Sequence, residues 1–281
     1  MFRFPIRTVV SALNRKLYSV TPRKSPGLIW KPAAFTAVTG ATTFGLSWVY
    51  LENQRRTYRD WRSAPRKVYR EEGIINRWWN NLSAADKFSV TIIAINVGVF
   101  LMWRVRPLHP LMEKYFLSTP ANKNSVSLLL SEFSHIDVWH LALNMLVLWS
   151  FAPALFDCLG DTTTAAHTLP FYITGGTFAS MVGHYFKLAR GNMAGSLGAS
   201  GALMAVVTLV VMNNPDSSLY FIFFPFIPIP AKWALTGVVS LDVIGVIRNW
   251  RFFDHAGHLG GVAFALCYQL FRRKQKDLDF I

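Results

Sequence analysis

The chain of 281 residues is 52% hydrophobic and only 16% charged, which is a low charge content for a soluble domain. Its apolar residues gather in long runs, and an α-helix needs about 20 apolar residues to cross the hydrocarbon layer. We therefore expect an all-α polytopic membrane protein and exclude a soluble domain with a large core. The formal net charge of +14 would suit a nucleic-acid-binding protein. The basic residues flank apolar runs and match no basic-aromatic motif, however, so no nucleic-acid partner is predicted.

Residues 1–31 are rich in Arg, Lys and Ser, and the first acidic residue of the chain is Glu52. This composition, with no continuous apolar core, is typical of a mitochondrial targeting presequence; a plain basic cytosolic tail is the alternative. Residues 32–51, "PAAFTAVTGATTFGLSWVYL", are long enough to span a membrane once, and Gly40 and Gly45 suit helix packing. Residues 52–87 are polar and Arg-rich, and they predict a basic connector.

Residues 88–271 contain six further apolar segments, which predicts six core helices after one extra helix. Before the fifth segment, "LYFIFFPFIPIP" is apolar, but its prolines at 225, 228 and 230 exclude a regular helix. We expect this stretch at the membrane surface, and a basic C-terminal tail over 272–281. The predicted segments are 88–103, 137–156, 169–187, 196–212, 231–247 and 254–271.

Polar side chains inside apolar spans are costly, so each is a candidate functional residue. Four stand out: His140 and Asn144, which lie i and i+4 on one helix face, Ser200 in "GASG", and His258 in "GHLGG". Taken singly, each has a structural explanation, because a serine among glycines is usually a packing residue and a lone histidine is often a helix cap. Ser196 is expected to be a bystander or a cap.

The order of the spans brings these four residues together. The second, fourth and sixth core spans run in the same direction, so His140, Ser200 and His258 should lie at similar depth below one surface. Small residues four apart on the fourth and sixth spans allow close backbone approach, which would bring Ser200 to His258. The small residues are Gly198, Ala202, Gly257, Gly261 and Ala265.

Other kinds of site are less well supported. Asp254, His255 and His258 lack the HExxH arrangement, so no metal is predicted. Cys158 and Cys267 do not form a disulfide framework. A small transporter or channel would show an internal repeat and charges along a path through the bilayer, and neither is found. Asp242 is an intramembrane carboxylate, which we expect to make a structural hydrogen bond and not to act as a third triad member.

Residues 88–271 resemble the rhomboid intramembrane serine proteases. "GASG" is similar to the Gly-x-Ser-Gly signature of that family, His140 and Asn144 to its His-xxx-Asn motif, and "GHLGGVAFA" to its Ala-His-xx-Gly-xxx-Gly motif. The extra leading span and the basic leader are most similar to the mitochondrial, presenilin-associated type and its fungal counterparts. Gly257 and Ala265 replace the usual Ala and Gly, and Met204 stands where many members carry an aromatic that packs on the histidine.

The resemblance implies an intramembrane serine endopeptidase that needs no cofactor. Ser200 would be the nucleophile and His258 the base. The His140 imidazole, the Asn144 amide and the Ser200 backbone N–H would stabilise the oxyanion, and Gly198, Gly201, Gly257 and Gly261 would form the substrate groove and its packing. The implied location is the mitochondrial inner membrane, as a multi-pass protein in contact with its lipids. The implied substrates are single-span membrane proteins cleaved within or next to their transmembrane segment. A catalytically silent rhomboid-type protein that binds membrane clients is the alternative.

Overall fold

The computed structural model describes residues 27–60, 73–221, 224–250 and 252–278. Most of the predicted presequence therefore lies outside the described residues. Residues 27–31, the last part of the predicted presequence, belong to helix α2 (Gly27–Asp60). This helix also runs past residue 51, the predicted end of the extra transmembrane helix. Helix α2 therefore extends beyond both ends of the predicted span 32–51, and on the C-terminal side its hydrogen bonding continues into polar residues.

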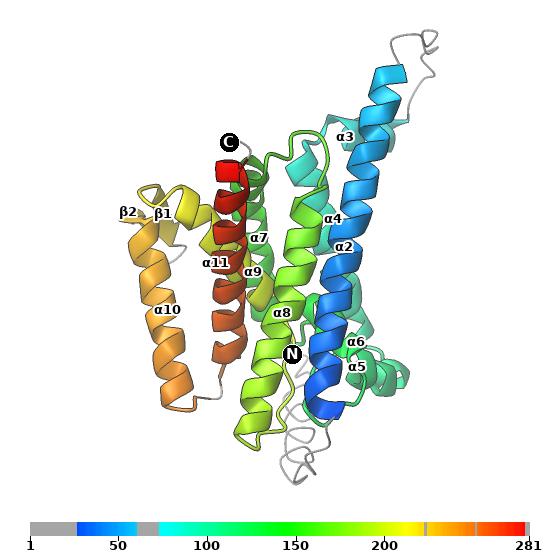
Figure 1. Ribbon diagram of the computed structural model, residues 1–281. Helices are drawn as coiled ribbons and strands as arrows, with labels where there is room; N and C mark the ends of the chain where they lie inside the picture. Colours follow the sequence, from blue (N-terminus) through cyan, green and yellow to red (C-terminus); the bar gives the residue numbers. More distant parts are fainter. Residues whose placement is uncertain (1–26, 61–72, 222–223, 251, 279–281) are drawn as a thin grey trace.

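The described chain is mainly helical, and its long helices lie side by side (Figure 1). This confirms the prediction of a mainly helical protein. After α2, the long helices are α4 (Ala84–Met102), α7 (Val138–Leu159), α8 (Thr168–Ala189), α9 (Ser200–Asn213), α10 (Ala231–Ile247) and α11 (His255–Leu278). The short helices are α3 (Ile74–Asn81), η2 (Arg106–Leu108), α5 (His109–Tyr115), α6 (Val126–Leu130) and η3 (Ser131–Phe133).

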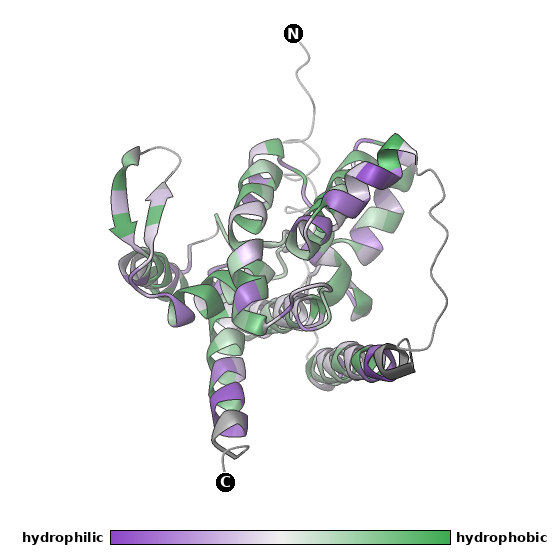
Figure 2. Ribbon diagram, turned by 90° about the horizontal axis from the view of Figure 1, so that it is seen from above, coloured by the Kyte–Doolittle hydropathy of each residue, from purple (hydrophilic) through white to green (hydrophobic). Residues whose placement is uncertain are grey.

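The outer faces of these helices are apolar. Figure 2 shows hydrophobic residues along much of the length of the helices, and large side chains such as Trp48, Trp149 and Leu241 are exposed. Such a surface is expected where lipid, not water, surrounds a protein. By length and composition alone, α4 and α7 qualify as membrane-crossing helices. The arrangement of one extra and six core transmembrane helices stays a prediction.

Three further boundaries differ from the sequence-based expectation. The connector 52–87 contains the end of α2, the short helix α3 and the start of α4, which Ser83 and Asp86 cap reciprocally. The C-terminal tail 272–281 is helical as far as Leu278. Most important for the site, α9 begins at Ser200 and not at 196, so Gly198 lies in the loop before it.

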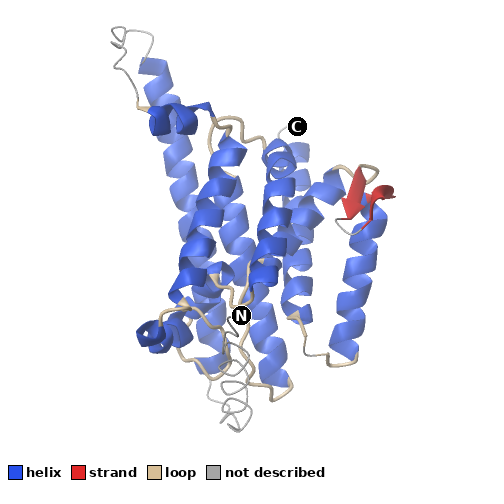
Figure 3. Cartoon of the chain, turned by 180° about the vertical axis from the view of Figure 1, so that it is seen from behind, coloured by secondary structure: helices blue, strands red, loops and turns tan. Residues whose placement is uncertain are grey.

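The proline-rich apolar stretch forms a β-hairpin at one end of α10 (Figure 3). Strands β1 (Ser218–Phe221) and β2 (Phe224–Pro230) pair antiparallel, with Ser218 opposite Pro230 and Leu219 opposite Ile229. The exclusion of a regular helix was correct, because proline lacks the N–H that a helix interior requires. The prediction of an all-α chain missed this hairpin.

The centre of the bundle is the packing of α11 against α8 and α9. A Cβ added at Gly261 of α11 would lie 2.2 Å from the Gly201 carbonyl oxygen of α9. On the neighbouring face, a Cβ at Gly260 would lie 2.8 Å from Val182 Cβ of α8. Absent side chains therefore allow these backbones to approach closely, as the small-residue pattern predicted. α2 packs on the outside of α8, where Thr43 Oγ1 and Thr174 Oγ1 are 3.0 Å apart.

We predict that Gly261→Ala lowers the thermal unfolding midpoint of the detergent-solubilised protein. The added methyl must push α11 away from α9, and overpacking of this kind costs about 1–3 kcal/mol. Gly98→Ala is the control, because a Cβ at Gly98 on α4 would meet nothing within 4 Å. Equal midpoints for the two variants would contradict the close approach of α9 and α11.

Candidate active site

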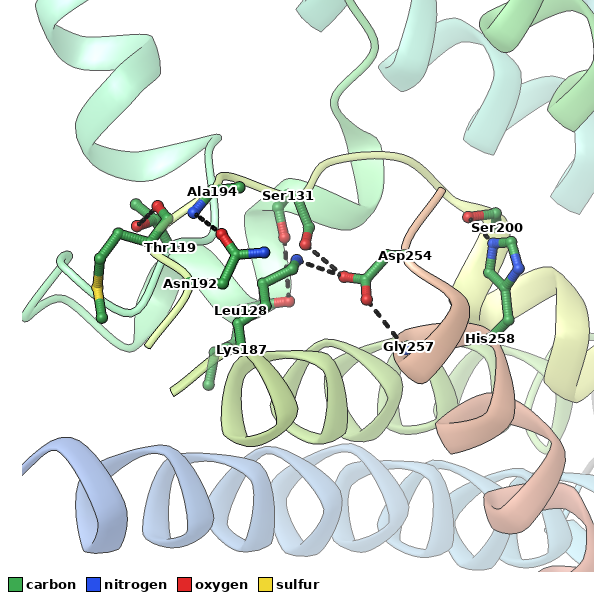
Figure 4. Close-up of polar contacts among 12 residues, drawn as sticks. Thr119, Leu128, Ser131, Lys187, Asn192, Ala194, Ser200, Asp254, Gly257 and His258 are labelled. Atoms are coloured by element: carbon green, nitrogen blue, oxygen red, sulfur yellow. Dashed lines mark hydrogen bonds and ion pairs between the residues drawn. The ribbon is translucent and has the colours of Figure 1, made fainter. Parts of the chain in front are cut away.

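Ser200 and His258 meet where α9 and α11 begin. Ser200 is the first residue of α9, and His258 lies in the first turn of α11. His258 Nε2 is 2.9 Å from Ser200 Oγ, and Figure 4 shows the two side chains facing each other. Gly201 and Gly257, which adjoin them in sequence, bring the two backbones close, because a Cβ at Gly201 would lie 3.8 Å from the Gly257 carbonyl oxygen. This is the hydrogen-bonding geometry that a serine nucleophile and its base require.

The loop before Ser200 is held in an extended, non-helical course. Gly198 has a φ of +124°, a region that side chains disfavour, and its N–H donates to the Ser131 carbonyl at 2.9 Å. Ser196 pairs with Ser118 through two backbone hydrogen bonds of 3.0 and 2.7 Å. Gly198 was expected on the fourth span as a helix-packing residue. Its role is instead in a fixed loop that leads into the nucleophile.

His140 lies against this loop. It occupies the first turn of α7, whose start is capped by the Asp137 carboxylate at the N–H groups of Trp139 and His140. A Cβ at Gly198 would lie 2.7 Å from His140 Cε1 and 3.0 Å from Nε2. The imidazole therefore covers the backbone two residues before Ser200.

Asn144 lies one turn further along α7, on the same face as His140. Its side-chain amide donates to the His140 carbonyl at 2.7 Å. In the described parts of the chain no hydrogen bond joins Asn144 or His140 to Ser200. The structure therefore brings Ser200 to His258 and His140 to the loop, while Asn144 bonds to its own helix.

The other nitrogen of His258 faces a carboxylate. Its Nδ1 lies 3.1 and 3.2 Å from the two oxygens of Asp242 on α10. The structural hydrogen bond expected of Asp242 is present, and its partner is the candidate base itself, which the sequence did not indicate. The same contact supplies the orienting group for His258, which the sequence does not identify because it places Met204 at the family's aromatic position.

Asp242, His255 and His258 are also near enough together to hold a metal ion, with their ligand atoms within 4.8 Å of one another. Those atoms already bond to one another as donors and acceptors, with His255 Nδ1 2.7 Å from Asp242 Oδ1. The Asp242 carboxylate is thus already bonded to both rings, and no metal role is assigned to the cluster. Cys158 and Cys267 are both free thiols.

Asp254, in the loop before α11, ties that loop to the segment before Ser200. Its carboxylate accepts from Lys187 Nζ at 2.8 Å and from the Gly257 N–H at 3.1 Å (Figure 4). It also accepts from the Ser196 hydroxyl. Burial on its own would raise the pKa of Asp254, but Lys187, Ser196 and the Gly257 amide outweigh burial and lower the pKa to about 2. Ser196 is thus a structural partner and not a bystander.

A cavity of about 30 Å³ opens beside the pair and has room for a water molecule. Its walls include Ser200 and His258, together with two carboxylates, Glu132 and Asp254. Glu132 and His135 are not among the predicted site residues, although His135 Nε2 accepts from the Ala199 N–H at 3.4 Å. Both precede the second core span in a short polar stretch, "SEFSH", and this polarity next to an apolar run was the available signal.

Fold and site together define a helical protein with an apolar exterior and a serine–histidine pair where two helices begin. Residues 122–275, more than half of the chain, match the family model described as the Rhomboid domain. The chain therefore belongs to the rhomboid family.

Among its curated relatives are the mitochondrial presenilin-associated rhomboid-like proteins of Bos taurus and Homo sapiens. Each is 40% identical over 252 residues, which cover 85% of this chain and 65% of the relative. Rhomboid protein 1, mitochondrial, of Saccharomyces cerevisiae is 35% identical over 179 residues, which cover 63% of this chain and 51% of the relative. The chain thus spans just under two thirds of the length of the mammalian relatives that it matches.

We predict that Asp254→Asn destabilises the protein at neutral pH by about 2 kcal/mol, and that this difference shrinks as the pH falls. The folded-state pKa of about 2 lies below the ordinary value of 3.8, so the stabilisation is present above about pH 4 and is lost toward pH 2. Thermal unfolding of both proteins between pH 7 and pH 3 measures it.

Asp216→Asn is the control for this prediction. The Asp216 side chain is 77% exposed and pairs with Lys232 at the surface, where an ion pair contributes little. Its removal should leave the midpoint unchanged at every pH. A constant effect of Asp254→Asn across the pH range would contradict the ionised state of Asp254.

Proposed function

We propose that the chain is an intramembrane serine endopeptidase that cleaves single-span membrane proteins within or next to their transmembrane segment. The observation that carries this proposal is the 2.9 Å contact of Ser200 Oγ with His258 Nε2 among apolar helices. Membership of the rhomboid family and the water-sized cavity beside the pair support it. No cofactor takes part.

In the proposed reaction, Ser200 Oγ attacks the carbonyl carbon of the scissile peptide bond while its proton passes to His258 Nε2. The C–N bond then breaks, and His258 returns the proton to the leaving amine. Water next attacks the acyl-enzyme, with His258 again taking a proton. The ester bond to Ser200 Oγ then breaks, His258 returns the proton to Oγ, and the new carboxyl terminus leaves.

The oxyanion that forms at each attack needs hydrogen-bond donors held in place beforehand. We propose the Ser200 backbone N–H, the His140 imidazole and the Asn144 amide for this role. The position of His140 against Gly198 supports its inclusion. Asn144 would have to release its bond to the His140 carbonyl, or present its second N–H, when substrate binds.

The substrate must present an extended backbone to Ser200, so its helix has to unwind locally. Transmembrane segments with weak helix propensity are therefore the expected class. The names of the relatives and the basic leader support a mitochondrial location. Within the mitochondrion, we propose a multi-pass protein of the inner membrane, in contact with its lipids.

We predict that Ser200→Ala and His258→Ala each abolish cleavage of a reconstituted single-span substrate while the protein stays folded. Ser240→Ala, which removes an exposed serine of α10, is the matched control and should cleave normally. Asn144→Ala should slow cleavage by about 100- to 1000-fold, the usual effect of losing one oxyanion donor. Gel analysis of product against time measures all four.

Labelling with a serine-reactive fluorophosphonate separates this proposal from a silent, client-binding protein. Ser200-dependent labelling is expected of an enzyme. A wild-type protein that neither labels at Ser200 nor cleaves would support the client-binding alternative, and continued cleavage by Ser200→Ala would refute the assigned nucleophile.

A further inference from the structure

Asp242 is a buried carboxylate that accepts hydrogen bonds from two imidazoles at once. It is 4% exposed on α10. Its Oδ1 lies 2.7 Å from His255 Nδ1 and 3.1 Å from His258 Nδ1, and its Oδ2 lies 3.2 Å from His258 Nδ1. A carboxylate can only accept, so both rings must carry a proton on Nδ1. A buried charge is thereby satisfied from two sides.

This arrangement determines the chemical state of His258. With the proton held on Nδ1 by Asp242, the neutral ring has its lone pair on Nε2. That lone pair faces Ser200 Oγ at 2.9 Å, which is the state that a general base needs. The opposite tautomer would present an N–H to Ser200 and could not take its proton.

His255 is held just as closely, although it does not touch Ser200. It is the first residue of α11 and is 7% exposed. Its ring lies over Gly245 of α10, where an added Cβ would come within 2.5 Å of ring carbons. Asp242 and Gly245 are three residues apart and so share one face of α10. α10 thus offers a carboxylate and, one turn later, the space for the ring that binds it.

In the described structure, the His255 ring makes its hydrogen bond to Asp242 through Nδ1. Its Nε2 is buried without a partner. A buried polar ring with one bond costs stability, so its presence is not explained by packing alone. An apolar side chain would fill the same space over Gly245 at less cost. A histidine at this position is therefore better explained by its hydrogen bond to Asp242.

We propose that His255 is a positioning residue: it fixes the Asp242 carboxylate, which in turn holds the Nδ1–H of His258 and keeps its Nε2 free for Ser200. This inference rests on the proposed protease function. It extends the serine–histidine pair into a chain of four residues from three helices, in the order Ser200, His258, Asp242, His255, with Gly245 providing the room.

The test compares five variants of the full chain in proteoliposomes: Asp242→Asn, His255→Leu, His255→Asn, Gly245→Ala and Gly237→Ala. Each is measured for kcat and KM on one single-span substrate, for its fluorophosphonate labelling rate and for its thermal midpoint. Gly237→Ala is the matched control, because Gly237 also lies on α10 and a Cβ there would meet nothing within 4 Å.

We expect Asp242→Asn to lower kcat and the labelling rate by about 100-fold or more with KM within about twofold, because an amide can favour the wrong tautomer. His255→Leu and Gly245→Ala should each lower kcat by about tenfold, the size expected for losing one hydrogen bond to a charged group. His255→Asn retains an N–H donor and should recover most of this loss. Gly237→Ala should match the wild type.

Two results would overturn the inference. One is a folded Asp242→Asn or His255→Leu protein with kcat and labelling within twofold of wild type, whatever its thermal midpoint. The other is a Gly245→Ala variant whose kcat is the same as that of Gly237→Ala. Failure of the proposed function is distinguishable, because the wild-type protein itself would then neither cleave nor label at Ser200.

Discussion

The site depends on the close approach of α9 and α11 at Gly201 and Gly261. Between helices in lipid there is no hydrophobic drive to associate, so contact comes from small residues that let backbones meet. In this chain the meeting point is one residue from Ser200 and one turn from His258. The same glycines that hold the helices together therefore set the distance between the two side chains. Packing and site geometry cannot be varied independently here.

Polar groups in an apolar surrounding are stable only when they satisfy one another. Ser200, His258, Asp242 and His255 do so across α9, α10 and α11. Each bond has a direction, so the cluster restricts how each helix may rotate about its axis. Apolar contacts alone would tolerate several rotations. The network thus gives α10, much of whose surface is exposed, a defined orientation against α11.

Much of this site was predictable from the sequence. The apolar segments and the shared direction of alternate spans were enough to expect Ser200 near His258, because direction and depth follow from counting. The start of α9 was not predictable, since "GSLGAS" is compatible with both a loop and a helix. The partner of His258 was sought at Met204 on α9, whereas it came from α10. The depth of a residue in its span follows from its position in the sequence. Which face α10 turns toward His258 depends on tertiary packing, which the sequence pattern does not give.

The loop residue Gly198 has a consequence for inherited variation. Its φ of +124° and the His140 ring 2.7 Å from where a Cβ would stand leave no room for any other amino acid. Every missense change at this codon adds at least a methyl group, whatever the residue introduced. Every substitution at Gly198 should therefore be harmful to a similar degree, because the backbone conformation and the lack of space exclude any side chain, whatever its chemistry.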